Sequence, residues 1–78
     1  MTLNEIDIND TCYIKEIKTE GEMRRRMFDL GLVEGTRIQC AFAAPFGEPR
    51  AYLVRGTLIA LRSEDAGKIE VKRVTAYE

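Results

Sequence analysis

The sequence contains no histidine and no tryptophan, and this scarcity narrows the range of functions. Histidine is the usual general base and the commonest transition-metal ligand, so its absence argues against most hydrolytic and metal sites. Ser63 has no base to activate it and is better explained as a helix cap. The pattern G-x-x-x-x-G-K-[ST] is also missing, so the chain is not expected to hydrolyse GTP itself. We therefore predict a protein that is not an enzyme and holds no metal or cofactor.

Cysteines and long apolar runs are scarce as well. The two cysteines, Cys12 and Cys40, fit neither a zinc-finger spacing nor a redox Cys-x-x-Cys. We predict both to be small buried residues in a reducing compartment. No apolar run approaches the roughly 20 residues that span a bilayer, and residues 1–10 lack the basic start and apolar core of a signal peptide. A cytoplasmic location is therefore expected.

Charge of either sign is not in excess. Twelve basic and thirteen acidic residues give a net charge of −1, which does not favour nucleic acid or an anionic membrane surface as a partner. Contact with a membrane is expected only through a partner protein. The 78 residues predict one domain over residues 1–78. A domain of that size buries only about two-thirds of its unfolded surface, so a deep catalytic cleft is not expected.

The clearest local signals lie in residues 21–36. Apolar residues recur there at helical spacing and predict a short helix with one buried face: Met23, Met27 and Leu30. Thr19 and Glu22 make a capping-box pattern at the start of this helix. Gly31 is predicted to end it in a left-handed conformation, and Gly35 to take the third position of a type II turn.

The rest of the chain is typical of short strands. Five segments are predicted as strands by alternation or composition: residues 12–18, 36–42, 50–54, 57–61 and 68–72. A phase slip between Ile14 and Ile17 indicates a bulge or the end of the strand. Arg55 and Gly56 predict a tight hairpin turn. Ser63 is predicted to cap one late helical turn, and a further capping pattern at residues 2–5 predicts a short N-terminal turn.

The strand pattern also predicts which side chains form the core. Ile38, Cys40 and Phe42 are expected to point inward from one strand, and Leu53 from the next. Five short strands are too few for a two-sheet sandwich, and a closed or nearly closed barrel would hide their edges. The predicted fold is therefore mainly β, a small barrel with one early α-helix and a late helical turn.

Several segments together resemble one known family. The succession RRRMFDLGLVEGT, APFGEP, VRG, IALR and KIEV closely resembles ferrous iron transport protein A (FeoA), over about residues 3–71. The resemblance implies an SH3-like β-barrel. It also implies a cytosolic accessory protein of bacterial ferrous iron uptake that acts on the membrane permease FeoB through its GTP-hydrolysing cytosolic part. The sequence departs from the family at Asp10 and Thr11, where a glycine is common, and this affects only the first turn.

Two groups of residues are candidates for partner contact. Arg24 and Arg25 are predicted to point outward from the helix, free for a partner carboxylate, and Phe28 to be partly exposed beside them. The alternatives are a solvated arginine face, with a weak pair between Arg25 and Asp29, and a Phe28 buried under the proline-rich loop.

The second group comes from the loop around residues 45–49 and the strand after it. Phe46 either plugs a barrel end or protrudes towards a partner. If Tyr52 points outward, it joins Phe46 and Arg50 in a second contact patch, although a half-buried tyrosine is the more frequent outcome.

Two further functions remain open. Domains of this kind also occur at the C-terminal end of iron-dependent transcriptional repressors, so a regulatory domain of that type is an alternative, although this chain lacks a helix-turn-helix. The other is a module that weakly self-associates through residues 37–42 or another strand edge.

Overall fold

The structure, a computed structural model, describes residues 1–74. Its strands are β1 (Thr11–Ile17), β2 (Arg37–Ala43), β3 (Arg50–Val54), β4 (Thr57–Leu61) and β5 (Ile69–Arg73). The helical elements are η1 (Leu3–Glu5), α1 (Gly21–Asp29) and α2 (Ser63–Ala66). The predicted strands, the early helix and the late helical turn are therefore all present, and the strand ends differ from the predicted ones by at most one residue.

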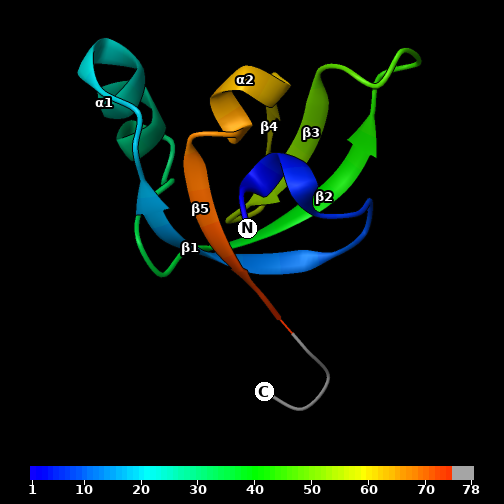
Figure 1. The fold of residues 1–78 in the computed structure, drawn as a ribbon, viewed down its shortest axis with the longest axis horizontal. Helices are drawn as coiled ribbons and strands as arrows, with labels where there is room; N and C mark the ends of the chain where they lie inside the picture. Colours follow the sequence, from blue (N-terminus) through cyan, green and yellow to red (C-terminus); the bar gives the residue numbers. More distant parts are fainter. Residues whose placement is uncertain (75–78) are drawn as a thin grey trace.

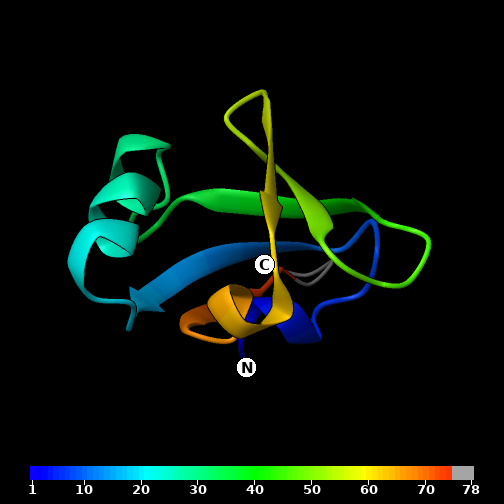
Figure 2. The ribbon, with the colours of Figure 1, turned by 90° about the horizontal axis from the view of Figure 1, so that it is seen from above.

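The five strands form one curved antiparallel sheet in the order β4-β3-β2-β1-β5 (Figure 1). The prediction was a closed or nearly closed barrel, and closure is wrong, because within residues 1–74 β4 and β5 do not pair with each other. The outer edge of β5 is instead covered by the N-terminus, where the Val71 N–H donates to the Met1 carbonyl at 2.9 Å and Thr2 bridges to Glu70. Figures 1 and 2 show η1 and α2 lying together near the open side of the sheet, with α1 at one end.

The inward face of the sheet is not the predicted one on β3. Cys40 pairs with Tyr52, and both side chains are fully buried, whereas Leu53 is 37% exposed. The ladder between β2 and β3 then slips by one residue, which turns Phe42 outward. The core assignments of Leu53 and Phe42 were therefore wrong, while that of Cys40 is confirmed.

The same core holds Ile38 and Cys12 from the strands, with Leu3 and Ile6 from the N-terminal segment. Both cysteines are free and buried, as predicted. Burial raises the pKa of Cys12 to about 11 and also raises that of Cys40, so both thiols are protonated at neutral pH.

Helix α1 is anchored to the core through its end and not through the predicted stripe. Only Met27 is buried in α1, while Met23 and Leu30 are exposed. The Gly31 N–H donates to the Phe28 carbonyl and the Leu32 N–H to the Met27 carbonyl, which is the Schellman arrangement. Leu32 and Met27 are both buried, so the residue after the glycine supplies the contact that the stripe was expected to make.

The conformations predicted for glycines and turns are confirmed more often than the predicted helix caps. Gly31 and Gly35 have φ of 93° and 88°, and Arg55 and Gly56 form the hairpin turn with φ of 50° and 81°. The ladder between β1 and β5 shifts register between Ile14 and Glu16, so β1 contains a bulge and continues past it.

Of the three predicted caps, only the N-terminal one is found. The capping box between Thr2 and Glu5 is formed. Glu20 occupies the cap position of α1, so the predicted box at Thr19 is wrong. Arg62 occupies that position in α2, with Ser63 already inside the helix.

Candidate functional site

A groove lies beside α1, and we call it the α1 groove. It has a volume of about 330 Å³ and is lined by Glu16, Ile17, Arg24, Phe28, Leu32, Val33 and Glu34. These residues come from the end of β1, from α1 and from the segment after α1. Two of the predicted contact residues, Arg24 and Phe28, are thus brought together here.

The apolar part of the groove is formed by Phe28 with the side chains behind it. Leu32 is fully buried, and Ile17 and Val33 are partly buried. Phe28 itself is 66% exposed, so the prediction of a partly exposed aromatic is confirmed. The alternative, burial under the proline-rich loop, is wrong, since the loop lies at the opposite end of the molecule from α1 (Figures 1 and 2).

Arg24 is not free for a partner, contrary to the prediction. Its Nη1 donates to the Ile17 carbonyl at 2.6 Å and approaches the Thr19 carbonyl at 3.5 Å. The guanidinium therefore connects the first turn of α1 to the end of β1. The angular position of Arg24 on the helix could not predict this contact, because it gives the direction of the side chain but not the position of the preceding strand.

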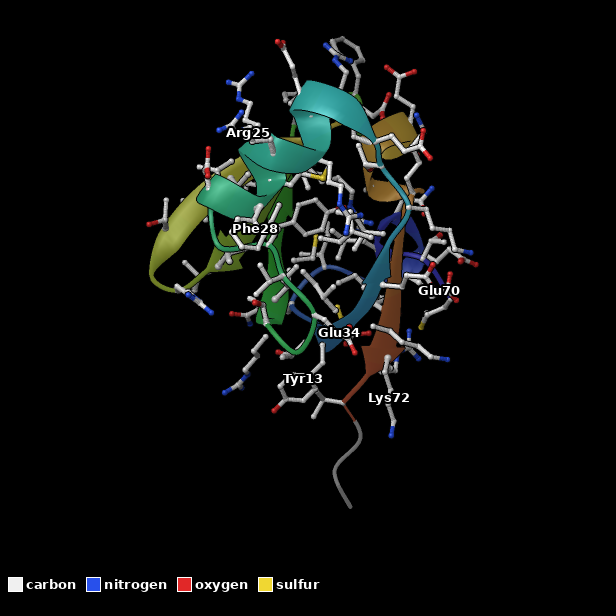
Figure 3. The ribbon with its side chains drawn as sticks, turned by 90° about the vertical axis from the view of Figure 1, so that its left-hand side faces the viewer. Tyr13, Arg25, Phe28, Glu34, Glu70 and Lys72 are labelled. Atoms are coloured by element: carbon white, nitrogen blue, oxygen red, sulfur yellow. The ribbon has the colours of Figure 1, made fainter. Side chains whose placement is uncertain are left out.

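Arg25 agrees better with the prediction. It is exposed, and it forms no ion pair within the described residues, not even with Asp29. Figure 3 shows it projecting outward from α1, away from the sheet. A guanidinium in that position can reach a partner carboxylate without breaking an internal contact.

The carboxylates of the groove were not anticipated from the sequence. Glu16 and Glu34 are far apart in the chain, but backbone bonds hold the segment around Gly35 against β1. The Gly35 N–H donates to the Ile14 carbonyl at 2.7 Å, and the Ile14 N–H donates to the Thr36 carbonyl at 2.9 Å. Both glutamates are exposed, and Figure 3 shows Glu34 below Phe28. No sequence motif connects them, so only the tertiary pairing reveals this juxtaposition.

The second predicted patch does not form. Phe46 is fully exposed in the loop after β2, but Tyr52 is 0% exposed and faces the core. Arg50 is partly buried, and its Nη1 donates to the Asn4 carbonyl at 3.1 Å, which ties β3 to η1. Tyr52 and Arg50 therefore stabilise the fold through core packing and a main-chain hydrogen bond. Of the three residues, only Phe46 is exposed for contact with a partner.

Other features of the described residues bear on metal and membrane functions. Residues 1–74 contain no group of three or more Cys, Asp or Glu side chains placed to hold a metal ion. No helix in this part of the chain is long and apolar enough to cross a membrane.

The chain is similar to proteins of ferrous iron transport. The model of the FeoA domain matches residues 1–73. A fusion protein of Porphyromonas gingivalis, named Fe(2+) transport protein A/Fe(2+) transporter FeoB, is 33% identical over 76 residues. That match covers 97% of this chain but only 9% of the fusion protein.

Solved structures of FeoA proteins share the fold. The solution structure of FeoA from Chlorobium tepidum has a TM-score of 0.92 and 32% identity, covering 100% of this chain and 74% of the other. The zinc complex of Stenotrophomonas maltophilia FeoA, described as a prokaryotic SH3 domain protein, has a TM-score of 0.81 and 28% identity, covering 92% of this chain and 89% of the other. The fold is thus SH3-like although its sheet is open. The chain belongs to the FeoA domain family, which is associated with ferrous iron transport.

Proposed function

We propose that this chain is a non-enzymatic accessory protein of bacterial ferrous iron uptake, acting in the cytoplasm as one domain. Its partner is the cytosolic, GTP-hydrolysing part of a FeoB-like permease. The observation that carries the proposal is the Porphyromonas gingivalis relative, in which a similar domain and a transporter named FeoB form one polypeptide. A covalent link holds two modules at high effective concentration, and this arrangement favours pairs that work in contact.

The surface around α1 is the contact that the geometry supports best. Eight of its nine residues are not buried, which is unusual for a helix of a small domain. Phe28 and Arg25 are exposed there, and aromatic and arginine side chains are enriched among residues that dominate binding energy. The buried contacts of α1 come from Met27 and the following Leu32, and Arg24 ties its first turn to β1, so the rest of its surface can face another protein.

Chemical-shift mapping tests the proposal. Isotope-labelled chain is mixed with the permease's cytosolic domain without nucleotide, with GDP and with a non-hydrolysable GTP analogue. We expect the largest amide shifts in α1 and the segment after it, and a loss of these shifts in Arg25→Glu. Arg62→Glu is the control, because Arg62 is exposed at the start of α2 and does not line the α1 groove. No shifts in any nucleotide state, together with no retention on the intact permease in detergent, would refute the proposal.

Self-association is a second candidate, favoured by one observation. The predicted edge, residues 37–42, lies in β2, which is paired on both sides and is therefore not available. β4 is an outer strand of the sheet, and its sequence TLIAL contains neither charge nor proline, the usual protections of an edge. Sedimentation at rising concentration tests this, with Leu58→Lys expected to abolish any dimer. A monomer at millimolar concentration would remove the candidate.

A further inference from the structure

The α1 groove is small and has an apolar lining. Its volume of about 330 Å³ lies at the lower end of ligand pockets, which span roughly 300–1,000 Å³. The buried Leu32 and the partly buried Ile17 and Val33 offer an apolar surface, and Phe28 stands over it with an exposed ring. An apolar side chain from a partner can therefore leave water by entering the groove.

The charged residues that line the groove beside this apolar surface carry a net negative charge. Within residues 1–74, Arg24 is the one cation that lines the groove, and its Nη1 donates to the Ile17 carbonyl while the guanidinium keeps its positive charge. Glu16 and Glu34 also line the groove, and neither forms an ion pair with any described residue. Two carboxylates and one guanidinium thus give the lining of the groove a net charge of −1.

This combination selects a basic ligand over an acidic one. An ammonium or guanidinium group can bind either carboxylate, and it can also lie over the exposed face of Phe28, where the ring attracts cations. A ligand carboxylate would be repelled by Glu16 and Glu34, and like charges across an interface suppress binding. Arg25, on the outer side of α1, is left for an acidic residue of the partner beyond the groove.

We infer that the α1 groove binds a basic, apolar segment of the permease's cytosolic part, with an aliphatic side chain against Phe28 and Leu32 and a neighbouring arginine or lysine on Glu16 and Glu34. The inference rests on the proposed function for the identity of the partner. The chemistry of the segment follows from the groove itself.

Charge reversal in the groove provides the first test. The double variant E16K/E34K is compared with E64K, which changes a glutamate of α2 outside the groove. We expect the double variant to bind the permease's cytosolic domain about tenfold more weakly, and E64K to change the affinity by less than about twofold. Thermal unfolding of each variant checks that the fold is kept. Equal affinity of wild type and a folded E16K/E34K would overturn the inference while leaving the proposed function intact.

Synthetic peptides test the groove without the permease. Three capped peptides of equal length are titrated into labelled chain: one with leucine and arginine, one with leucine and glutamate, and one with serine and arginine. We expect only the first to shift the amides of Phe28, Leu32 and Val33, and its effect to disappear in F28A. Binding of the glutamate peptide at equal strength would overturn the inference. Binding of the arginine peptide with no response to the permease would support the groove chemistry and refute the proposed partner.

Discussion

Substitution of Arg24 is the most direct test of the structure, because helical periodicity and the structure assign this residue different roles. The sequence predicts a free, solvent-exposed guanidinium. In the structure the Arg24 Nη1 donates to the Ile17 carbonyl at 2.6 Å. The test is Arg24→Met, which keeps the length and helix propensity of the side chain and removes the guanidinium.

The expected loss of stability follows from one bond. A hydrogen bond to a charged group contributes about 1.5–3 kcal/mol when buried. This bond lies in an exposed setting, so water can replace it in part, and the contact with Thr19 at 3.5 Å is too long to add much. We expect the free energy of unfolding to fall by about 1 kcal/mol, which lowers the melting temperature of a domain this size by roughly 4–8 °C.

The assay is thermal and urea unfolding followed by circular dichroism, with Arg25→Met as the matched control. Arg25 lies next to Arg24 in the same helix but forms no ion pair within residues 1–74. The free energy of unfolding of Arg25→Met should therefore stay within about 0.5 kcal/mol of the wild-type value. If both variants unfold at the same midpoint, the bond to Ile17 contributes nothing, and Arg24 returns to the candidates for partner binding.

Three further predictions concern the core and the turns. Gly31→Ala puts a Cβ on a residue with φ of 93°, at 3.3 Å from the Arg55 Cδ. Its free energy of unfolding should therefore fall by about 1–2 kcal/mol in urea unfolding experiments. An unchanged unfolding midpoint would mean that the turn relaxes around the new methyl group. The buried Tyr52 hydroxyl makes no hydrogen bond of ordinary geometry in residues 1–74, although the Arg50 guanidinium is near enough to oppose the rise of its pKa by burial. Tyr52→Phe should therefore be neutral or stabilising by up to about 1 kcal/mol, and a clear loss of stability would contradict this. Burial holds the pKa of Cys12 at about 11 against an ordinary value of 9.0. The unfolded thiol therefore ionises first, so the contribution of Cys12 to stability should be constant below about pH 9 and fall by about 2 kcal/mol as the pH approaches 11. Burial also raises the pKa of Cys40 and of Tyr52, and both act in the same direction. Cys12→Ala should weaken this dependence in reducing buffer, and an identical pH profile would exclude the thiol as its source.

Much of the fold followed from local chemistry. Gly31 and Gly35 have positive φ because the turns around them need a conformation that other residues rarely take, and this requirement is visible in the sequence. The hairpin at Arg55 and Gly56 and the capping box at Thr2 are similarly local. These features depend on residues a few positions apart, so no knowledge of the rest of the chain is needed.

The face of β3 could not be predicted in the same way. Tyr52 and Leu53 are both large and apolar, and alternation predicts only that they point to opposite sides. The pairing of Tyr52 with Cys40 on β2 decides which one is buried. Register is a property of two strands together, so a single strand's sequence leaves it open.

The candidate site shows the same division. The sequence alone determined where Phe28 and Arg25 lie relative to each other on α1, because helical spacing fixes this, but it left open whether Phe28 is exposed or buried under the proline-rich loop. Only the tertiary structure decided that Arg24 is bound to the end of β1 and that Glu16 and Glu34 share one groove. The physical reason is distance along the chain: the contacts within α1 are set by its own geometry, whereas the groove exists only once Gly35 is hydrogen-bonded to β1.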